Sequence, residues 1–267
     1  MKVSFIGGGN MGEAILSTLI THKLARPEDI FVADAKTGRQ DYLKQKYSVF
    51  TTGCNQEAAK LGDVVILAVK PQQTDEVTHE LNGCLQSDQL VLSIIAGKKL
   101  ATLRQGLGHE AIVRAMPNTP AQIGCGMTIW TATDSTSTTN LANAEAILSI
   151  MGHAVYASDE IVMDMATAVS GSGPAYVFLF IEAFIQAGQR IGLTTELARL
   201  LALETVRGAT EYARISGQDL AELRRNVTSP GGTTAAALKV FEEGDFIGLM
   251  EQAVAAAYRR AQELGKT

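Results

Sequence analysis

The residues at the start of the chain have the types and spacing that bind a dinucleotide. Gly7, Gly9 and Gly12 follow the apolar run Val3–Ile6 with the spacing G-x-G-x-x-G. The first glycine permits a tight turn, the second lets the backbone approach a pyrophosphate, and the third lets a helix pack closely on a strand. The helix that follows would direct its free N–H groups at the phosphates. The sequence therefore predicts a dinucleotide site here.

The choice between NAD(H) and NADP(H) depends on the residues that follow the second apolar run. This run ends at Ala33. Asp34 lies 22 residues after Gly12, where a carboxylate can accept a hydrogen bond from the ribose 2′-hydroxyl, and this favours NAD(H). Lys36 and Arg39 follow directly and could bind the 2′-phosphate of NADP(H). Asp34 could also simply begin the next helical region. The sequence leaves the choice between NADH and NADPH open.

The elements that must position these groups change in character near residue 160. Before it, short apolar runs alternate with helical stretches, which is the pattern of an α/β, doubly wound fold whose parallel sheet is covered on both faces. The expected strands are residues 3–6, 30–33, 64–69, 91–95, 112–116 and 127–131, and the expected helices include residues 12–20, 37–47 and 72–81.

After Glu160 the sequence shows no convincing strand. Long helical segments are expected at residues 175–191, 194–215 and 246–264. We therefore predict two domains, a dinucleotide-binding domain at residues 1–159 and an all-helical domain at residues 160–267. The helical part is rich in alanine and is too small to close a core easily, so we expect it to pack against a second subunit.

Composition and charge exclude several classes of protein. A net charge of -5 and a pI near 5.5 leave no basic surface for nucleic acid. No uninterrupted run of about 18 apolar residues occurs, so no transmembrane helix is expected. Glycines come too early in the chain for a signal peptide. The three cysteines, Cys54, Cys84 and Cys125, lack metal-type spacing, so we expect no metal site and reduced thiols in a cytoplasm.

Five motifs together are more specific than any general α/β argument. They are GGGNMG at residues 7–12, AVKPQ at 68–72, RAMPNTP at 114–120, SGSGPAY at 170–176 and NVTSPGGTT at 226–234. In this order, over essentially the whole chain, they resemble the pyrroline-5-carboxylate reductase family.

The resemblance implies a Rossmann domain followed by a helical dimerisation domain that interlocks two subunits, with dimers often assembling into larger rings. It also implies reduction of L-1-pyrroline-5-carboxylate to L-proline with NADPH or NADH, the last step of proline biosynthesis. Matched by motif, the cofactor would contact Ile6, Gly7, Gly8, Gly9, Asn10, Met11, Asn55, Ala68, Val69, Lys70, Pro71, Ala96 and Gly97. The substrate would contact Asn226, Ser229, Pro230, Gly231, Gly232, Thr233 and Thr234, with Glu160 a weaker match.

Two positions depart from the usual pattern of that family. Thr233 stands where some relatives carry alanine, and Asp34 stands where many relatives that prefer NADPH carry a neutral residue. The second departure puts the usual cofactor preference in doubt.

The chemistry of residues 229–234 supports the substrate assignment independently. Hydroxyl groups and free backbone N–H groups before a helix form a suitable cradle for a carboxylate, although the same residues could be an ordinary helix cap. Imine reduction needs a hydride at carbon and a proton at nitrogen, so no strong nucleophile is required. We expect Thr234 to hydrogen-bond the ring nitrogen and relay the proton, and Glu160 to help hold the iminium charge.

Two other functions would also use a dinucleotide-binding domain of this kind. A hydroxyacid dehydrogenase of related architecture would carry a lysine base on the first helix after the junction, and residues 175–182 contain none. A nucleotide sensor without catalysis would not need an intact SPGGTT run. A related cyclic imine, such as the six-membered homologue, remains open as the substrate.

Overall fold

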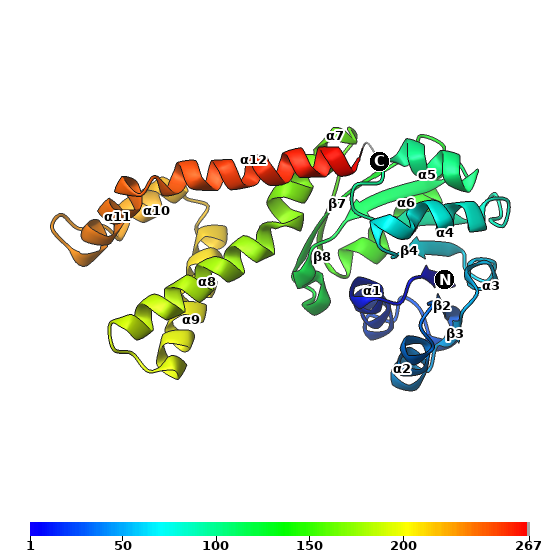
Figure 1. The fold of residues 1–267 in the computed structure, drawn as a ribbon, viewed down its shortest axis with the longest axis horizontal. Coiled ribbons are helices and arrows are strands. Elements are labelled where there is room, and N and C mark those ends of the chain that lie inside the picture. The colour runs from blue at the N-terminus through cyan, green and yellow to red at the C-terminus, as the bar shows by residue number, and fades with distance from the viewer. Residues whose placement is uncertain (266–267) are drawn as a thin grey trace. The chain divides into compact units, whose positions relative to one another are not determined.

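The computed structural model describes residues 1–265 and divides into two compact units. The larger unit contains Met1–Ser172 and the segment that starts at Ala257, and the smaller unit is Gly173–Ala256. These limits differ from the predicted domains at 1–159 and 160–267, because α7 (Ile161–Ala166) packs with the sheet and the last turn of α12 (Phe246–Leu264) contacts the loop at Gly97. Figure 1 shows the strands of the larger unit and the helices that make up the smaller one.

The larger unit is built on a single eight-stranded sheet. Its strands are β1 Val3–Ile6, β2 Ile30–Ala33, β3 Phe50–Thr52, β4 Val64–Leu67, β5 Leu90–Ser93, β6 Ile112–Met116, β7 Gly126–Ala132 and β8 Gly152–Tyr156. They lie in the order β3-β2-β1-β4-β5-β6-β7-β8. The first six in sequence run parallel to one another and β1, β4 and β5 are buried along their whole length. This confirms the doubly wound α/β fold.

Two features of the sheet were not expected from the sequence. β7 runs antiparallel to β6, because nine residues separate Met116 from Gly126 and a parallel return needs a dozen or more. The strands β3 and β8 were missed because they lie at or near the edges of the sheet and are largely exposed, so neither has a continuous apolar run. All six expected strands are present, with ends that shift by one or two residues.

The helices of the larger unit connect these strands. They are α1 Asn10–Thr21, α2 Thr37–Tyr47, α3 Asn55–Ala59, α4 Thr74–Leu81, α5 Leu100–Leu107, α6 Thr138–Ser149 and α7 Ile161–Ala166. Their apolar sides and the two faces of the sheet form two buried clusters, one including Phe5, Ile15 and Leu92, the other including Ile6, Leu67 and Leu103. The core therefore lies on both faces of the sheet, as a doubly wound fold requires.

The smaller unit is entirely helical in the part of the chain that is described. It contains α8 Gly173–Arg190, α9 Thr195–Ser216, α10 Leu220–Asn226, α11 Thr233–Glu243 and the first half of α12 Phe246–Leu264. Thr194 and Asp219 cap α9 and α10 through their side-chain oxygens, as the residue types predict. The three long helices expected from the sequence are confirmed to within two residues at each end.

Large apolar side chains are exposed along these helices. Phe178 and Leu179 on α8 are 61% and 66% exposed, and Leu200 on α9 is 58% exposed. By length and composition alone, the helical run Ile161–Arg190 could cross a membrane, and only 6% of its most apolar window is buried. The sequence predicts no transmembrane helix, and a single helix of this kind is weak evidence for a membrane span. A face of this kind requires a covering surface.

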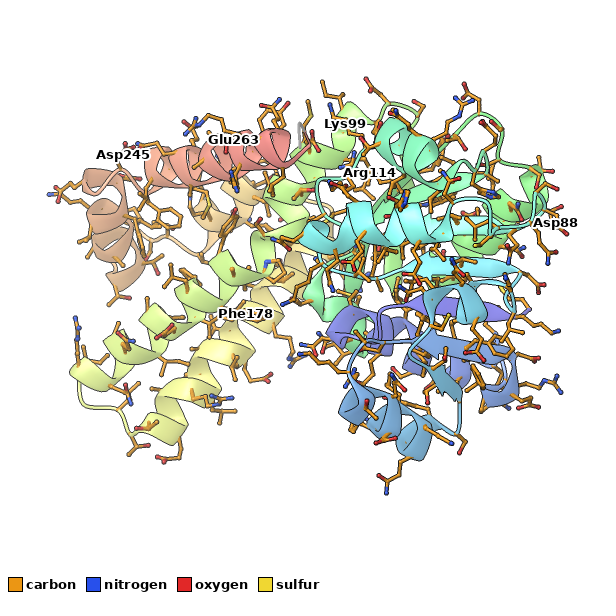
Figure 2. The ribbon with its side chains drawn as sticks, turned by 45° about the vertical axis from the view of Figure 1, so that its right-hand side comes forward. Asp88, Lys99, Arg114, Phe178, Asp245 and Glu263 are labelled. Atoms are coloured by element: carbon orange, nitrogen blue, oxygen red, sulfur yellow. The ribbon has the colours of Figure 1, made fainter. Side chains whose placement is uncertain are left out.

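A buried arginine joins β6 to α7 inside the larger unit (Figure 2). The Arg114 side chain is 4% exposed, its Nη1 donates to Glu160 Oε1 at 2.8 Å, and its Nη2 donates to Asp164 Oδ1 at 3.2 Å. Glu160 Oε1 also accepts the N–H of Leu100 at the start of α5, at 2.8 Å. Because a buried charge needs partners, these contacts hold α7 against the sheet and explain why the unit extends past residue 160.

A second charged network joins α1 to α2. The carboxylate of Glu13 accepts four hydrogen bonds, from Arg39 at 2.5 Å, Tyr47 at 2.8 Å, Lys46 at 2.9 Å and Tyr42 at 3.0 Å. Burial raises the pKa of Glu13, but the four donors outweigh it and lower the pKa from its ordinary 4.5 to about 2. The charged form of Glu13 is therefore favoured by folding.

This network predicts a specific dependence of stability on acid. Since the pKa of Glu13 is depressed in the folded chain, its contribution is complete above pH 4.5 and is lost as the pH falls towards about 2. Glu13→Gln removes this titration. We expect the free energy of unfolding of the unmodified chain to fall more steeply than that of the variant across this window, measured by urea unfolding at a series of pH values. Parallel curves would contradict the assignment.

Candidate active site

The order of the strands predicts a ligand crevice beside β1 and β4. The chain runs outward from β1 to β2 and β3 on one side, and to β4, β5 and β6 on the other. At such a switch in direction, the loops that follow two neighbouring strands separate and leave a crevice at their carboxyl ends. The two loops here are the glycine loop after β1 and residues 68–71 after β4. Both were assigned to the cofactor from the sequence.

The glycines of the first loop show the fit that a dinucleotide requires. Gly7 has φ +100°, and a Cβ atom there would lie 2.8 Å from the carbonyl oxygen of Ala68. A Cβ on Gly12 would lie 2.6 Å from the carbonyl oxygen of Gly7. A Cβ on Gly9 would meet no atom within 4 Å. Two of the glycines therefore let backbone segments approach each other, while the third leaves an open backbone face for a pyrophosphate.

Most of the other residues assigned to the cofactor lie at the end of β1, at the start of α1 and in the turn after β4. Ile6 ends β1, and Asn10 and Met11 begin α1, where free N–H groups face the loop. Lys70 precedes the 3₁₀ turn Pro71–Gln73, with Pro71 at its first position. These residues belong to the two loops that meet at the crevice.

Two further positions assigned to the cofactor lie outside these two loops. Asn55 begins α3, and its side-chain amide donates to Glu80 at 2.7 Å. Gly97, after β5, has φ +77°, and a Cβ there would lie 2.7 Å from Cβ of Leu264. The loop at Ala96 and Gly97 therefore contacts the last described turn of α12. No feature of the sequence indicates that contact.

Asp34 and Arg39 lie on two sides of Gly8. The Oδ2 atom of Asp34 accepts the N–H of Gly8 at 2.9 Å, and its Oδ1 atom accepts the N–H of Lys36 at 2.9 Å. The Nε atom of Arg39 donates to the carbonyl oxygen of Gly8. The structure thus brings Asp34 and Arg39, two of the three candidate readers of the ribose, to the glycine loop. The side chain of Lys36 is exposed to solvent.

A π-helical turn connects two of the motifs. Residues Thr167–Gly171 form this turn between α7 and α8. The side-chain amide of Asn118 donates to the carbonyl oxygen of Ser170 at 3.1 Å and accepts the N–H of Met127 at 2.9 Å. A Cβ on Gly171 would lie 2.9 Å from the Cε atom of Met116. The RAMPNTP and SGSGPAY motifs therefore pack together, and π turns of this kind are frequent at functional sites.

Glu160, a predicted catalytic residue, is already paired in the structure. Its carboxylate accepts hydrogen bonds from Arg114 and from the N–H of Leu100. Sequence reasoning named Glu160 but missed Arg114, although an arginine within an apolar strand is a signal that a charged partner must lie nearby. In this arrangement the carboxylate fixes the start of α5, which follows the loop at Gly97.

The residues assigned to the substrate form one turn of the smaller unit. Asn226 ends α10, Gly231 has φ +71°, and a Cβ on Gly232 would lie 2.5 Å from Oγ of Ser229. The helix α11 begins at Thr233, so Thr233 and Thr234 belong to its first turn. Gly232 is the capping residue and offers no side-chain cap, which leaves the first N–H groups of α11 available to an anion.

The smaller unit also contains an apolar hollow of about 410 Å³ on α8 and α9. Its lining includes Phe178, Ile181, Ile185 and Leu203. This hollow continues the exposed apolar surface of the two helices. Among residues 1–265, no cluster of three or more histidine, cysteine or acidic side chains is placed to hold a metal ion.

Comparisons with known proteins match both halves of the chain. A family model described as pyrroline-5-carboxylate reductase dimerisation matches residues 160–264. A model described as NADP oxidoreductase, coenzyme F420-dependent, matches residues 2–97. The first match begins at the residue where the sequence predicted the helical domain to start.

Full-length relatives extend these matches. A pyrroline-5-carboxylate reductase from Synechocystis sp. is 46% identical over 266 residues, which cover 100% of this chain and 99% of that protein. The structure of a pyrroline-5-carboxylate reductase from Coxiella burnetii is similar with a TM-score of 0.90 and 40% identity, covering 100% of this chain and 99% of that one. A Plasmodium falciparum pyrroline carboxylate reductase with NADP bound has a TM-score of 0.91 and 33% identity, covering 99% and 98%. This chain therefore belongs to the pyrroline-5-carboxylate reductase family.

Proposed function

We propose that this chain reduces L-1-pyrroline-5-carboxylate to L-proline with NAD(P)H, as the last step of proline biosynthesis. The observation that carries the proposal is the similarity over the full length to reductases of this family, 46% identical in one case. The five sequence motifs and the open backbone face at Gly9 agree with it. An imine as substrate also fits a chain whose motifs supply hydroxyl and backbone N–H groups and no strong nucleophile.

The cofactor residues are proposed as follows. The backbone of Gly7, Gly8 and Gly9, with the start of α1 at Asn10, Met11 and Gly12, would hold the pyrophosphate. Asp34 or Lys36 would contact the adenosine ribose. Asn55, at the start of α3, would also contact the cofactor. Ile6, Ala68, Val69, Lys70, Pro71, Ala96 and Gly97 would border the path towards the nicotinamide. When bound, the nicotinamide supplies a hydride to the imine carbon.

The substrate residues would act through the first turn of α11. The N–H groups that Gly232 leaves uncapped, and the hydroxyls of Ser229 and Thr233, suit a carboxylate. Asn226, Pro230 and Gly231 would shape this turn. The half-buried hydroxyl of Thr234 would hydrogen-bond the ring nitrogen and pass it a proton as the amine forms. Holding the imine in one orientation would supply much of the rate.

Glu160 is proposed to act as a positioning residue. The Oε1 atom of its carboxylate accepts hydrogen bonds from Arg114 and from the N–H of Leu100, which gives the side chain a structural role. Leu100 follows Gly97 by three residues, and Glu160 therefore holds the end of the loop that borders the cofactor. The expectation that Glu160 helps to hold the iminium charge stays a prediction, and the variants below test it against the positioning role.

The chain is proposed to form a homodimer in the cytoplasm, with rings of dimers as a further assembly. The match of residues 160–264 to a dimerisation model supports the dimer. The exposed apolar side chains of α8 and α9 give the physical reason, because their burial would supply the free energy of association. The predicted cytoplasmic location agrees with three cysteines that are all free.

The experiment that tests the function follows the loss of reduced-nicotinamide absorbance with purified protein. Pyrroline-5-carboxylate and its six-membered homologue are each supplied, with NADH or NADPH, and the amino acid formed is identified chromatographically. Formation of proline is the expected result. Turnover of the six-membered imine alone would reassign the substrate, and binding of cofactor without turnover of either imine would favour a sensor.

Thr234→Ala tests the proposed proton relay. We expect kcat to fall by about 10² or more, as for loss of a general acid, with little change in the Kd of the cofactor. Thr234→Ser keeps the hydroxyl and serves as the matched control, which should retain most of kcat. An unchanged kcat in the alanine variant would remove Thr234 from the mechanism.

Variants of the buried ion pairs separate positioning from catalysis at Glu160. Arg114→Met should lower the free energy of unfolding by about 3 kcal/mol or more, because two carboxylates then lose their cation. Glu160→Gln should destabilise the chain less and retain kcat within a small factor. A loss of kcat of about 10² in Glu160→Gln, with stability unchanged, would restore the catalytic assignment.

Phe178→Lys tests the dimer. The ring of Phe178 is 61% exposed on α8, where Figure 2 labels it, and a charge there would oppose burial against another apolar surface. We expect the mass measured by light scattering to shift from dimer or larger towards monomer. Phe50→Lys places the same charge on a 41% exposed phenylalanine of β3 and should leave the mass unchanged. Equal masses for all three proteins would count against this surface.

A further inference from the structure

Glu13 occupies a distinctive position beside the glycine loop. It follows Gly12 directly and lies in the first turn of α1. Its side chain is 16% exposed and accepts hydrogen bonds from four side chains, all of them on α2. A network of this density fixes the carboxylate, and through it the donors, in one arrangement.

Arg39 is the donor of that network that reaches the glycine loop. Its Nη2 atom pairs with Glu13 at 2.5 Å and lies 3.4 Å from the carbonyl oxygen of Gly9. Its Nε atom donates to the carbonyl oxygen of Gly8, and its guanidinium lies over the ring of Tyr42, 4.9 Å from the centroid. The positive charge of Arg39 is therefore paired with Glu13, and its Nε and Nη2 donors already have acceptors on Gly8, Gly9 and Glu13.

Asp34, which contacts the N–H of Gly8, is bonded to backbone groups and is not paired with a cation in these contacts. Both of its oxygens accept backbone N–H groups, from Gly8 and from Lys36, and these bonds fix the carboxylate at the end of β2. A carboxylate in this place accepts a hydrogen bond from a free ribose 2′-hydroxyl and repels a 2′-phosphate. The remaining cation, Lys36, has an exposed and well hydrated side chain, so its attraction for a phosphate is screened.

We propose that Glu13 is a positioning residue for cofactor specificity, which holds Arg39 against the glycine loop and leaves Asp34 to read the ribose. The chain then favours NADH over NADPH. This inference rests on the proposed function, because it concerns the dinucleotide that the reaction uses.

Calorimetric titration of the full chain with NADH and with NADPH tests the inference without turnover. The unmodified chain should bind NADH more tightly, by about tenfold, the scale of one charge-assisted hydrogen bond. Glu13→Ala should release Arg39 towards the phosphate and shift the ratio of the two Kd values towards NADPH by about fivefold to tenfold. Adding Arg39→Ala to that variant should remove the shift, because Arg39 carries it.

A matched control distinguishes specificity from general damage to the network. Tyr47→Phe removes one donor of Glu13 and leaves the pair with Arg39, so the ratio of Kd values should stay as in the unmodified chain. A merely structural role for Glu13 would weaken both dinucleotides by the same factor in Glu13→Ala, and that result would overturn the inference.

Two other outcomes separate this inference from the proposed function. Tighter binding of NADPH by the unmodified chain, with proline still formed, would overturn the inference alone. Binding of neither dinucleotide would overturn both. The imine assay on the same preparations tells these cases apart.

Discussion

The cofactor half of this protein depends on the narrow gap between the glycine loop and the end of β4. The backbone at Gly7 approaches Ala68 so closely that no side chain fits, and Gly12 approaches Gly7 in the same way. This approach is possible because β1 and β4 are neighbouring parallel strands in exact register, from Val3 beside Val64 to Ile6 beside Leu67. Between Gly7 and Gly12, whose backbones are closely packed, the backbone of Gly9 stays open to a ligand. The pairing of β1 with β4 therefore determines the conformation of the glycine loop, and the loop conformation determines where a ligand fits.

The charges of the larger unit are organised in a similar way, around two residues that each hold several partners. Glu13 joins α1 to α2 with four donors, and Arg114 joins β6 to α7 with two carboxylates. Both networks end at loops that border the crevice, one at Gly8 and the other, through Glu160, at the start of α5. The same contacts that stabilise the fold also fix the loops that would touch a cofactor.

Much of the fold and part of the site could be predicted from the sequence, for physical reasons that differ between elements. The buried strands were predictable because burial on both faces demands continuous apolar runs, and the glycine loop because its spacing reflects backbone geometry. Edge strands such as β3 lack that signal. The direction of β7 follows from the short connection after β6, whose length can be read only once both strand ends are known, and the π turn at Thr167–Gly171 has no sequence pattern of its own.

The pairing of charges was the least predictable part of the site. Glu13 and Arg39 are 26 residues apart, and Arg114 and Glu160 are 46 apart, so nothing local indicates either pair. Sequence reasoning could name Asp34, Lys36 and Arg39 as competing readers of a ribose. It could not rank them, because the ranking depends on which cation already has a carboxylate beside it.

The contact between Gly97 and Leu264 has a consequence for how the family can change over time. Position 97 is restricted twice, by its positive φ and by the Cβ of Leu264, which lies 2.7 Å from where a new Cβ would stand. A larger residue at position 97 is therefore disfavoured by the positive φ even if residue 264 has a smaller side chain. A smaller side chain at position 264 makes no unfavourable contact with Gly97. Of the two positions in this contact, residue 97 should therefore vary less among related chains than residue 264.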